Sequence, residues 1–454
     1  MNLIPNYQNK KVLIVGLAKS GFYAAKLLHQ LGAQVIVNDY KKLTADNPQV
    51  QELNSLNIKV ITGSHPLSLL DDNIDLIVKN PGISYDNPLI KQAQIKHIPI
   101  ITEPELAYEI SEAPFICVTG TNGKTTTTTL IQLILDCNRS IGHAYKAGNI
   151  GIPAIKVAQQ ATSNDDIVVE MSSFQLMGIT QLRPQIAVLT NIYEAHLDYH
   201  KTRANYIKAK MNITKNQTPT DYFVVNFDQQ EWQELAKQTN AQVVPFSRLN
   251  KTQAGAYQKG NYLYFKNEKI ISVADLALPG QHNIENYLAA IAVAKIYGKS
   301  TADICQILTT FKGVKHRMQF VKKLAGRSIY NDSKATNIEA TTVALQSFTQ
   351  PVVLIAGGLD RGFTFDELIG PMKNVKAIVL YGETKKLMAA TAQKAHISTI
   401  KLVDNLDEAV PLAWSLTSPG DILLLSPAAA SWDQFKTFEE RGDRFLSDIE
   451  KLGE

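Results

Sequence analysis

The sequence predicts an α/β protein of three domains: Rossmann-like domains at the two ends and a central P-loop domain with a mixed sheet. Three observations support this prediction. Short apolar runs alternate with helical patterns along most of the chain, as in parallel sheets. Glycine-rich turns follow apolar runs at residues 16–21 and 120–123. The length of 454 residues suits about three domains. We expect them to span residues 1–102, 103–313 and 314–454.

Composition narrows the class of protein. The net charge of +4, from 46 basic and 42 acidic residues, lacks the basic excess of a nucleic-acid binder. No apolar run reaches the length of a membrane span, and the first residues contain no apolar core of a signal peptide. Cys117, Cys137 and Cys305 are widely spaced and fit reduced thiols. These features favour a cytoplasmic enzyme with small-molecule partners.

The first domain opens as a βαβ unit. A strand at Lys11–Val15 precedes the glycine turn at residues 16–21 and a helix, and a second strand follows at Gln34–Asp39. A dinucleotide-binding fingerprint has glycine at position 18, and Ala18 therefore argues against NAD. A phosphate-bearing ligand at this turn remains expected, with Asp39 placed to reach its ribose or base.

A further strand at residues 75–78 ends in the loop Asn80-Pro-Gly82. Ligands of open α/β sheets bind at the carboxyl ends of the strands, where this loop would lie. A plain turn explains the same residues equally well. The segment at residues 100–104 closes the first domain.

The central domain opens with a strand at residues 114–118, the turn Gly120-Thr-Asn-Gly-Lys-Thr-Thr126 and a helix. Backbone amides at a helix N-terminus bind anions, and Lys124 and Thr125 add an ammonium for phosphate and a hydroxyl for Mg²⁺. The standard P-loop would have glycine at position 118, which is Val118 here. The shorter motif still predicts a nucleoside triphosphate cradle, and a glycine turn with a surface lysine is the alternative.

Polar residues follow later elements of this domain. Glu170 ends a strand at Asp166–Glu170, where a P-loop sheet holds its metal, although strand ends are also often simply solvated. His196 fits a metal ligand or a polar loop residue. Asn283 and Asn286 share one helix face and fit either purine recognition or N-capping by Asn283. Strands at Tyr222–Asn226 and residues 242–246, with a hairpin at 255–272, complete the mixed sheet.

The third domain begins after a hinge expected at residues 311–317. Polar loops follow three of its strands, which is typical of a substrate-binding edge. Catalytic parts on separate domains predict closure around this hinge, measurable as compaction in small-angle scattering with ATP analogue and substrate. Its predicted strands form a second doubly wound sheet: residues 328–330, 352–356, 377–381, 399–403 and 421–425.

These motifs, in this order over essentially the whole chain, resemble the Mur ligases, the ATP-dependent amino-acid ligases of peptidoglycan synthesis. The stretch from Ser426 to Gly442 is similar to the members that add D-glutamate, and the Asp-Asn-Pro-Arg motif of the diaminopimelate- and lysine-adding members is absent. The resemblance implies an enzyme with ATP and Mg²⁺, acting as a monomer in the cytoplasm. Its substrates would be D-glutamate and UDP-N-acetylmuramoyl-L-alanine, whose carboxylate is activated as an acyl phosphate.

The resemblance also implies roles for individual residues. Lys210 would be a carbamylated metal ligand, although a surface helical lysine is its ordinary explanation. The catalytic residues would be Lys124, His196, Lys210 and Lys334. The metal ligands would be Thr125, Glu170, His196 and Lys210. ATP would bind Gly120, Thr121, Asn122, Gly123, Lys124, Thr125, Thr126, Asn283, Arg317 and Asp332. The UDP-substrate would bind Gly16, Ser20, Asp39, Asn80, Gly82 and Asn149, and D-glutamate would bind Lys334, Thr336, Ser431 and Phe438.

Two departures and three alternatives accompany this interpretation. Asn80 stands where family members often have serine, and Arg361 stands near a lysine of some D-glutamate-adding members; both changes keep polarity or charge. A folylpolyglutamate synthase-like ligase shares the cradle but would not require the first domain. A non-ligase P-loop switch would not require Asp332, Lys334 or the C-terminal loops. An NAD-dependent dehydrogenase is disfavoured by Ala18 and the cradle.

Overall fold

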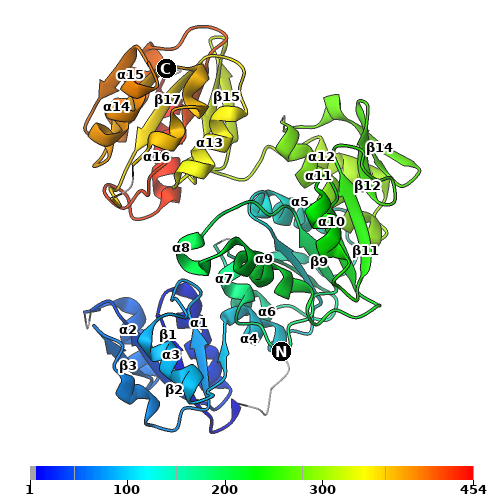
Figure 1. The fold of residues 1–454 in the computed structure, drawn as a ribbon, viewed down its shortest axis with the longest axis vertical. Helices are drawn as coiled ribbons and strands as arrows, with labels where there is room; N and C mark the ends of the chain where they lie inside the picture. Colours follow the sequence, from blue (N-terminus) through cyan, green and yellow to red (C-terminus); the bar gives the residue numbers. More distant parts are fainter. Residues whose placement is uncertain (1–6, 45, 150, 279, 363, 453–454) are drawn as a thin grey trace. The chain divides into compact units, whose positions relative to one another are not determined.

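The computed structural model describes residues 7–44, 46–149, 151–278, 280–362 and 364–452 (Figure 1). The start of the first domain, residue 150 of the loop at 148–153 and residue 279 before the long central helix lie outside this description. The chain divides into two compact units, Met1–Phe311 and Lys312–Glu454, and the division falls within the expected hinge. The first unit contains two sheets and the second contains one, which confirms the three-domain α/β fold.

The first sheet is parallel throughout, with the order β3-β2-β1-β4-β5. Along β1 the side chains of Val12 and Ile14 pack with α1 and α2, whereas Leu13 and Val15 pack with α3 on the opposite face. This alternation is what a strand covered by helices on both faces requires. The elements are β1 (Lys11–Val15), α1 (Lys19–Gln30), β2 (Gln34–Asp39), α2 (Pro48–Ser55), β3 (Lys59–Thr62), η2 (Leu67–Leu70), β4 (Leu76–Lys79), α3 (Pro88–Ile95) and β5 (Ile100–Ile101).

The central sheet has nine strands in the order β14-β13-β12-β11-β10-β9-β6-β8-β7. The expected hairpin at residues 255–272 is a three-stranded antiparallel extension, joined to the parallel part through β12 and β11. The sheet is therefore mixed, as predicted. Its strands are β6 (Phe115–Thr119), β7 (Ala144–Gly148), β8 (Asp166–Glu170), β9 (Ile186–Leu189), β10 (Tyr222–Asn226), β11 (Gln242–Ser247), β12 (Ala256–Lys259), β13 (Tyr262–Phe265) and β14 (Glu268–Ser272).

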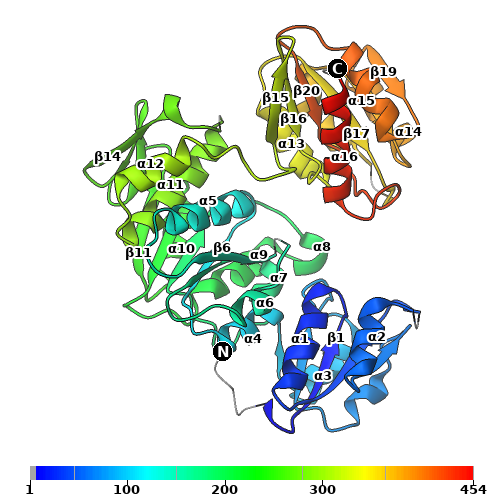
Figure 2. The same ribbon diagram turned by 180° about the vertical axis from the view of Figure 1, so that it is seen from behind.

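Helices cover both faces of this sheet, and α5 packs against α11 and α12 (Figure 2). The helices are α4 (Glu103–Ile110), α5 (Lys124–Asp136), α6 (Ala154–Ala158), α7 (Ser173–Leu176), α8 (Leu197–His200), α9 (Arg203–Met211), η3 (Asn212–Thr214), α10 (Gln230–Ala236), η4 (Val273–Asp275), α11 (Gln281–Ile296) and α12 (Thr301–Leu308). Within the described chain, no helix is both long and apolar enough to cross a membrane.

The second unit contains a six-stranded sheet in the order β15-β16-β20-β17-β18-β19. All five predicted strands are present; the sequence analysis missed the antiparallel edge strand β15. The strands are β15 (Gln319–Leu324), β16 (Arg327–Asn331), β17 (Val352–Gly357), β18 (Val375–Tyr381), β19 (Thr399–Leu402) and β20 (Ile422–Leu425). The helices are α13 (Ile338–Gln346), η5 (Asp366–Leu368), η6 (Pro371–Asn374), α14 (Lys385–Lys394), α15 (Leu406–Ser415) and α16 (Phe438–Lys451).

Candidate active site

The turn between β6 and α5 forms a cradle from residues 120–126. Gly123 precedes the helix in the left-handed conformation, with a φ of 80°. The Lys124 ammonium donates to the carbonyl oxygens of Gly120 at 2.9 Å and Thr121 at 2.8 Å, so it lies over the turn. Val118 is a buried residue of β6, paired in register with Glu170. The loop is therefore shorter than a standard P-loop because position 118 belongs to the strand.

Residues at the end of the neighbouring strand β9 brace the cradle. Thr190 Oγ1 donates to the Asn122 carbonyl oxygen at 2.7 Å, and Asn191 Oδ1 accepts from the Asn122 amide at 2.8 Å. The Thr121 amide donates to the Asn191 carbonyl oxygen at 2.9 Å. The sequence analysis assigned Thr190 and Asn191 no role. Two polar residues directly after a buried strand could have indicated that they contact the neighbouring loop.

The amide pair on α11 supports the same turn. The helix begins after Gly280, which caps it without a side-chain hydrogen bond, so the alternative of N-capping by Asn283 is wrong. Asn286 Oδ1 accepts from Thr127 Oγ1 at 3.1 Å and therefore holds the first turn of α5. Asn283 is buried on the same helix face. Its contact with adenine stays a prediction.

Glu170 ends β8 beside the cradle with its carboxylate buried. Thr125 Oγ1 donates to Glu170 Oε2 at 2.6 Å, and Asn149 Nδ2 donates to Glu170 Oε1 at 3.0 Å. A carboxylate and a hydroxyl are oxygen ligands of the kind that Mg²⁺ takes. No set of three or more His, Cys, Asp or Glu side chains suited to a metal occurs in the described chain. An ion held by Glu170 and Thr125 would therefore complete its shell with phosphate and water oxygens.

Lys210 lies inside the molecule, at 1% exposure, so the alternative of a surface helical lysine is wrong. Its Nζ donates to the Gly120 carbonyl oxygen at 2.7 Å and lies 4.6 Å from the centre of the Tyr206 ring. Burial, followed by the charge of Lys124, holds the pKa of Lys210 well below its ordinary value. The α9 helix thus directs an amine with a lowered pKa at the same backbone oxygen that Lys124 contacts.

His196 precedes α8 in the left-handed conformation, with a φ of 56°, and is exposed. Its ring lies 5.1 Å from the ring of Phe174 and 6.2 Å from the ring of Tyr206. Phe174 comes four residues after Glu170 in the sequence. The histidine ring is thus packed near two aromatic rings, and its role as a metal ligand stays a prediction. The Asp198 side chain lies outside the described part of the structure.

The first domain brings four of its predicted residues together at the carboxyl edge of its sheet. Gly16 has a φ of 96°, and a Cβ there would lie 2.6 Å from Asn80 Cβ. Asn80 Nδ2 donates to Ser20 Oγ at 3.2 Å, and Asn80 Oδ1 accepts from the Gly82 amide at 3.1 Å. The glycine turn at residues 16–21 and the loop at residues 80–82 therefore pack against each other and are joined by a hydrogen bond. Their binding of the UDP-substrate stays a prediction.

Asp39, at the end of β2, contacts the same turn. One carboxylate oxygen accepts from the Leu17 amide at 2.7 Å and the other from the Lys41 amide at 2.8 Å. Asp39 thus holds the backbone of the turn. Asn149, also predicted to bind this substrate, lies in the central domain and donates to Glu170.

In the second unit, the ends of β16, β20 and β17 are adjacent and carry the predicted polar loops. Burial raises the pKa of Asp332 to about 7, and its carboxylate accepts from the Met318 amide and Ser426 Oγ. Lys334 Nζ lies 5.6 Å from the centre of the Phe438 ring. Thr336 donates its amide to the Lys334 carbonyl oxygen, within the same loop.

Two further residues mark this edge. Ser431 is buried, and its hydroxyl has no hydrogen-bond partner among the residues that the structure describes. Arg441, which the sequence analysis did not single out, is fully buried and donates to the carbonyl oxygens of Ser333 and Ala429. It therefore ties the loop after β16 to the loop after β20. An arginine on the apolar face of a helix was its only signal in the sequence.

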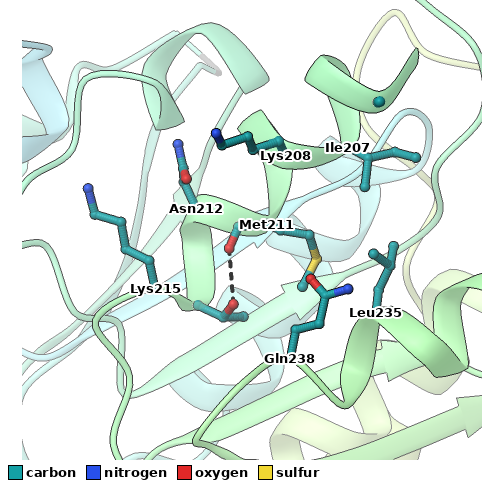
Figure 3. A pocket seen from close by; sticks show the side chains of 9 residues that line it. Ile207, Lys208, Met211, Asn212, Lys215, Leu235 and Gln238 are labelled. Carbon is teal, nitrogen blue, oxygen red and sulfur yellow. Dashed lines mark hydrogen bonds between the residues drawn. The ribbon is translucent and has the colours of Figure 1, made fainter. Parts of the chain in front are cut away.

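A pocket of about 380 Å³ lies on the outer side of α9 (Figure 3). Its wall is apolar at Ile207, Met211 and Leu235, and the Lys208 and Lys215 side chains lie at its rim. None of the predicted site residues lines it, and Lys210 is buried elsewhere on the same helix. The pocket therefore carries no argument about the substrates.

The fold and the cradle define a P-loop nucleotide-binding enzyme that combines three α/β domains. Comparison with known proteins gives the particular family. The "Mur ligase MurD-like, N-terminal domain" matches residues 10–102, the "Mur ligase middle domain" matches 118–294, and the "Mur ligase, glutamate ligase domain" matches 316–429. The chain belongs to the Mur ligase family and is an ATP-dependent amide ligase, so the interpretation as a non-ligase P-loop switch is wrong.

Individual relatives agree with this assignment. UDP-N-acetylmuramoylalanine–D-glutamate ligases of Latilactobacillus sakei and Ligilactobacillus salivarius are 60% and 59% identical over 455 residues, and cover all of this chain and 100% and 99% of their own. Among solved structures, UDP-N-acetylmuramate–alanine ligase MurC from Thermotoga maritima has a TM-score of 0.60 at 18% identity, covering 97% of this chain and 99% of its own. MurF ligase from the same organism, solved in complex with ADP, has a TM-score of 0.57 at 17% identity and covers 99% of this chain and 98% of its own. At this identity the two structures show the shared fold.

Proposed function

We propose that this enzyme joins D-glutamate to UDP-N-acetylmuramoyl-L-alanine through an acyl phosphate, in the cytoplasmic synthesis of peptidoglycan precursors. The observation that carries the proposal is the match over the full length, at 60% identity, to a ligase named for these two substrates. The match to a MurD-like first domain favours it over a folylpolyglutamate synthase-like activity. We further propose that the enzyme acts as a monomer.

The first step brings two anions together, the triphosphate of ATP and the carboxylate of the UDP-substrate. The cradle amides and Lys124 would hold the phosphates, since amides at a helix N-terminus and an ammonium offset negative charge. Adenine would face Asn283, with Arg317 and Asp332 supplied by the third domain. Mg²⁺ held by Thr125 and Glu170 would add positive charge at the phosphates.

Lys210 would act as a carbamate. Its amine would attack CO₂ to form the N–C bond and lose one proton, which leaves a carboxylate on the side chain. Two observations support this role: the lowered pKa favours the neutral, nucleophilic amine, and the amine lies at the Gly120 carbonyl oxygen of the cradle. With His196, this carboxylate would hold a second metal ion near the reacting groups.

The first domain would hold the UDP part of the substrate at Gly16, Ser20, Asp39, Asn80 and Gly82, and Asn149 would contact the muramoyl part. Lys334, Thr336, Ser431 and Phe438 would bind D-glutamate. Ser431 supports this assignment, because a buried hydroxyl without a described partner requires an acceptor or donor, and a carboxylate supplies one. The substrate carboxylate would attack the γ-phosphorus of ATP and release ADP, which gives the acyl phosphate. The neutral amine of D-glutamate would then attack the acyl carbon and lose a proton, and the tetrahedral intermediate would release phosphate to leave the amide.

Phosphate release by the purified protein with ATP, Mg²⁺ and UDP-N-acetylmuramoyl-L-alanine tests the proposal. We expect release that depends on D-glutamate and is not supported by L-glutamate, L-lysine or diaminopimelate. Equal release without the UDP-substrate, or with another amino acid in place of D-glutamate, would reject the assigned reaction. Gel filtration with light scattering tests the monomer, and a dimer mass would contradict it.

A further inference from the structure

Lys79 is a buried lysine that the sequence and site arguments leave without a role. It is the last residue of β4 and is 1% exposed. Its Nζ donates to the carbonyl oxygens of Asn80 at 3.2 Å, Pro81 at 3.3 Å and Ile83 at 2.7 Å. No carboxylate of the described residues forms a salt bridge with it. The loop at residues 80–83, which carries two of the proposed substrate-binding residues, therefore wraps its backbone around one ammonium.

This arrangement orients the peptide groups of the loop. The C=O and N–H of a trans peptide point in opposite directions, so the Pro81 and Ile83 carbonyls turned toward Nζ turn the Gly82 and Ser84 amides away from it. The Gly82 amide donates to Asn80 Oδ1, whereas the positive end of the peptide dipole at Ser84 faces outward, which suits an anionic ligand at the loop. Burial lowers the pKa of Lys79 to about 7, and the three carbonyl oxygens favour the charged form.

The same ammonium also reaches the central domain. Lys79 Nζ lies 3.4 Å from the Tyr199 hydroxyl, and that hydroxyl donates to the Ile83 carbonyl oxygen at 3.0 Å. Tyr199 belongs to α8, which begins directly after His196, and its ring lies 4.5 Å from the ring of Phe174. A second contact joins the same segments, since Lys201 forms a salt bridge with Asp86 at 3.3 Å.

We propose that Lys79 is a positioning residue for the UDP-substrate: its ammonium holds the loop at residues 80–83 in its binding conformation and, through Tyr199, joins that loop to the segment that carries His196. The inference rests on the proposed function for the identity of the substrate. Its geometry, however, requires only that an anionic ligand binds at the loop. Lys79 does not touch that ligand and acts through the backbone that does.

Lys79→Met tests the proposal, because methionine fills a similar volume without the ammonium. We expect the KM for UDP-N-acetylmuramoyl-L-alanine to rise about tenfold, since hydrogen bonds to a charged group are lost. The KM for ATP should change less than about threefold, because the cradle is not contacted. Lys96→Met is the matched control: Lys96 also donates to a backbone carbonyl of the first domain, that of Leu70, but away from the loop.

Hydrogen exchange supplies a readout independent of catalysis. In Lys79→Met, amides at residues 80–84 and at 197–201 should both exchange faster, whereas Lys96→Met should leave both segments unchanged. Tyr199→Phe keeps the aromatic ring and removes only the hydroxyl, so it tests the link if Lys79→Met does not fold. We expect it to raise the KM for the UDP-substrate and the exchange of residues 80–84.

Three outcomes would overturn the inference. They are an unchanged KM for the UDP-substrate in folded Lys79→Met, an equal rise in the KM for ATP, and no effect of Tyr199→Phe on residues 80–84. Failure of the proposed function is separately visible, because the wild-type enzyme would then release no phosphate in response to D-glutamate. Calorimetric titration of wild type and Lys79→Met with UDP alone would still test whether Lys79 supports an anion site.

Discussion

Substitution of Gly120 by alanine should disrupt the nucleotide cradle. Gly120 has a φ of 149°, which side-chain-bearing residues rarely adopt, and the added Cβ would lie 1.9 Å from Thr190 Oγ1 and 3.2 Å from the Asn191 amide nitrogen. Thr190 has little freedom to move, because its hydroxyl donates to the Asn122 carbonyl oxygen. The loop backbone has to shift instead, and with it the carbonyl that accepts from Lys124 and Lys210.

The magnitude follows from these two effects. Backbone strain at such a position costs about 1–3 kcal/mol. Loss of the hydrogen bond between Thr190 and Asn122 adds about 1 kcal/mol. The sum is about 2–4 kcal/mol. Nucleotide binding has to supply this free energy to restore the cradle, so the affinity for nucleotide should be weaker by about 30- to 1,000-fold.

Calorimetric titration of Gly120→Ala with a non-hydrolysable ATP analogue measures this loss. Gly298→Ala is the matched control, because Gly298 also has a positive φ, of 75°, but no described atom lies within 4 Å of its added Cβ. It should lower the Tm and leave the nucleotide Kd unchanged. Thr190→Ala removes the oxygen that clashes, so the double variant should bind nucleotide better than the sum of the single effects predicts. Wild-type affinity in Gly120→Ala, or strict additivity in the double variant, would refute the reasoning.

Three other substitutions test separate parts of the structure. Ser431→Ala should raise the KM for D-glutamate about 10- to 100-fold in steady-state assays, because a hydrogen bond to a charged group is lost. The KM for ATP should stay unchanged, and an unchanged KM for D-glutamate would contradict the proposed contact. Lys210→Met, which cannot form a carbamate, should lower kcat at least about 100-fold, and full activity would exclude the carbamate. Burial raises the pKa of Glu103 to about 7. The folded state therefore keeps a proton that the unfolded state releases, and stability falls by up to about 3 kcal/mol as the pH rises from about 4.5 through 7. In Glu103→Gln this fall in the calorimetric Tm should be absent, and a persisting fall would point to another group.

The strands that bear motifs could be predicted to within one or two residues. β1, β2, β8 and β10 begin and end as expected, because each is an apolar run bounded by glycine or polar residues. The edge strand β15 escaped detection, since its lysines break the apolar pattern, although it pairs with β16 across a turn of only two residues. The hairpin at residues 255–272 contains a third strand, because β12, β13 and β14 follow one another and pair across short turns.

The candidate site depends on both local and distant information. The cradle and Glu170 follow from strands and helices whose ends the sequence indicates, so their proximity could be predicted. The sequence did not show which residue caps α11. The helix begins at Gln281 and Gly280 is its N-cap, so Asn283 lies inside the first turn. Lys210 was interpretable as a surface residue because nothing in α9 itself shows that its inner face meets the cradle.

Residues that join elements are the least visible in sequence, and Lys79 shows why. A lysine at the end of a buried strand is ordinarily solvated, and only the path of residues 80–83 gives this one three carbonyl acceptors. Its contact with Tyr199 spans 120 positions of the chain. Arg441 acts in the same way in the second unit, because its guanidinium donates to the carbonyl oxygen of Ser333, 108 positions earlier in the chain. A buried cation is costly unless it has hydrogen-bond acceptors, so the backbone carbonyls around it are held in fixed positions. Lys79 and Arg441 therefore fix loops beside the proposed substrate sites, and no sequence motif marks this role.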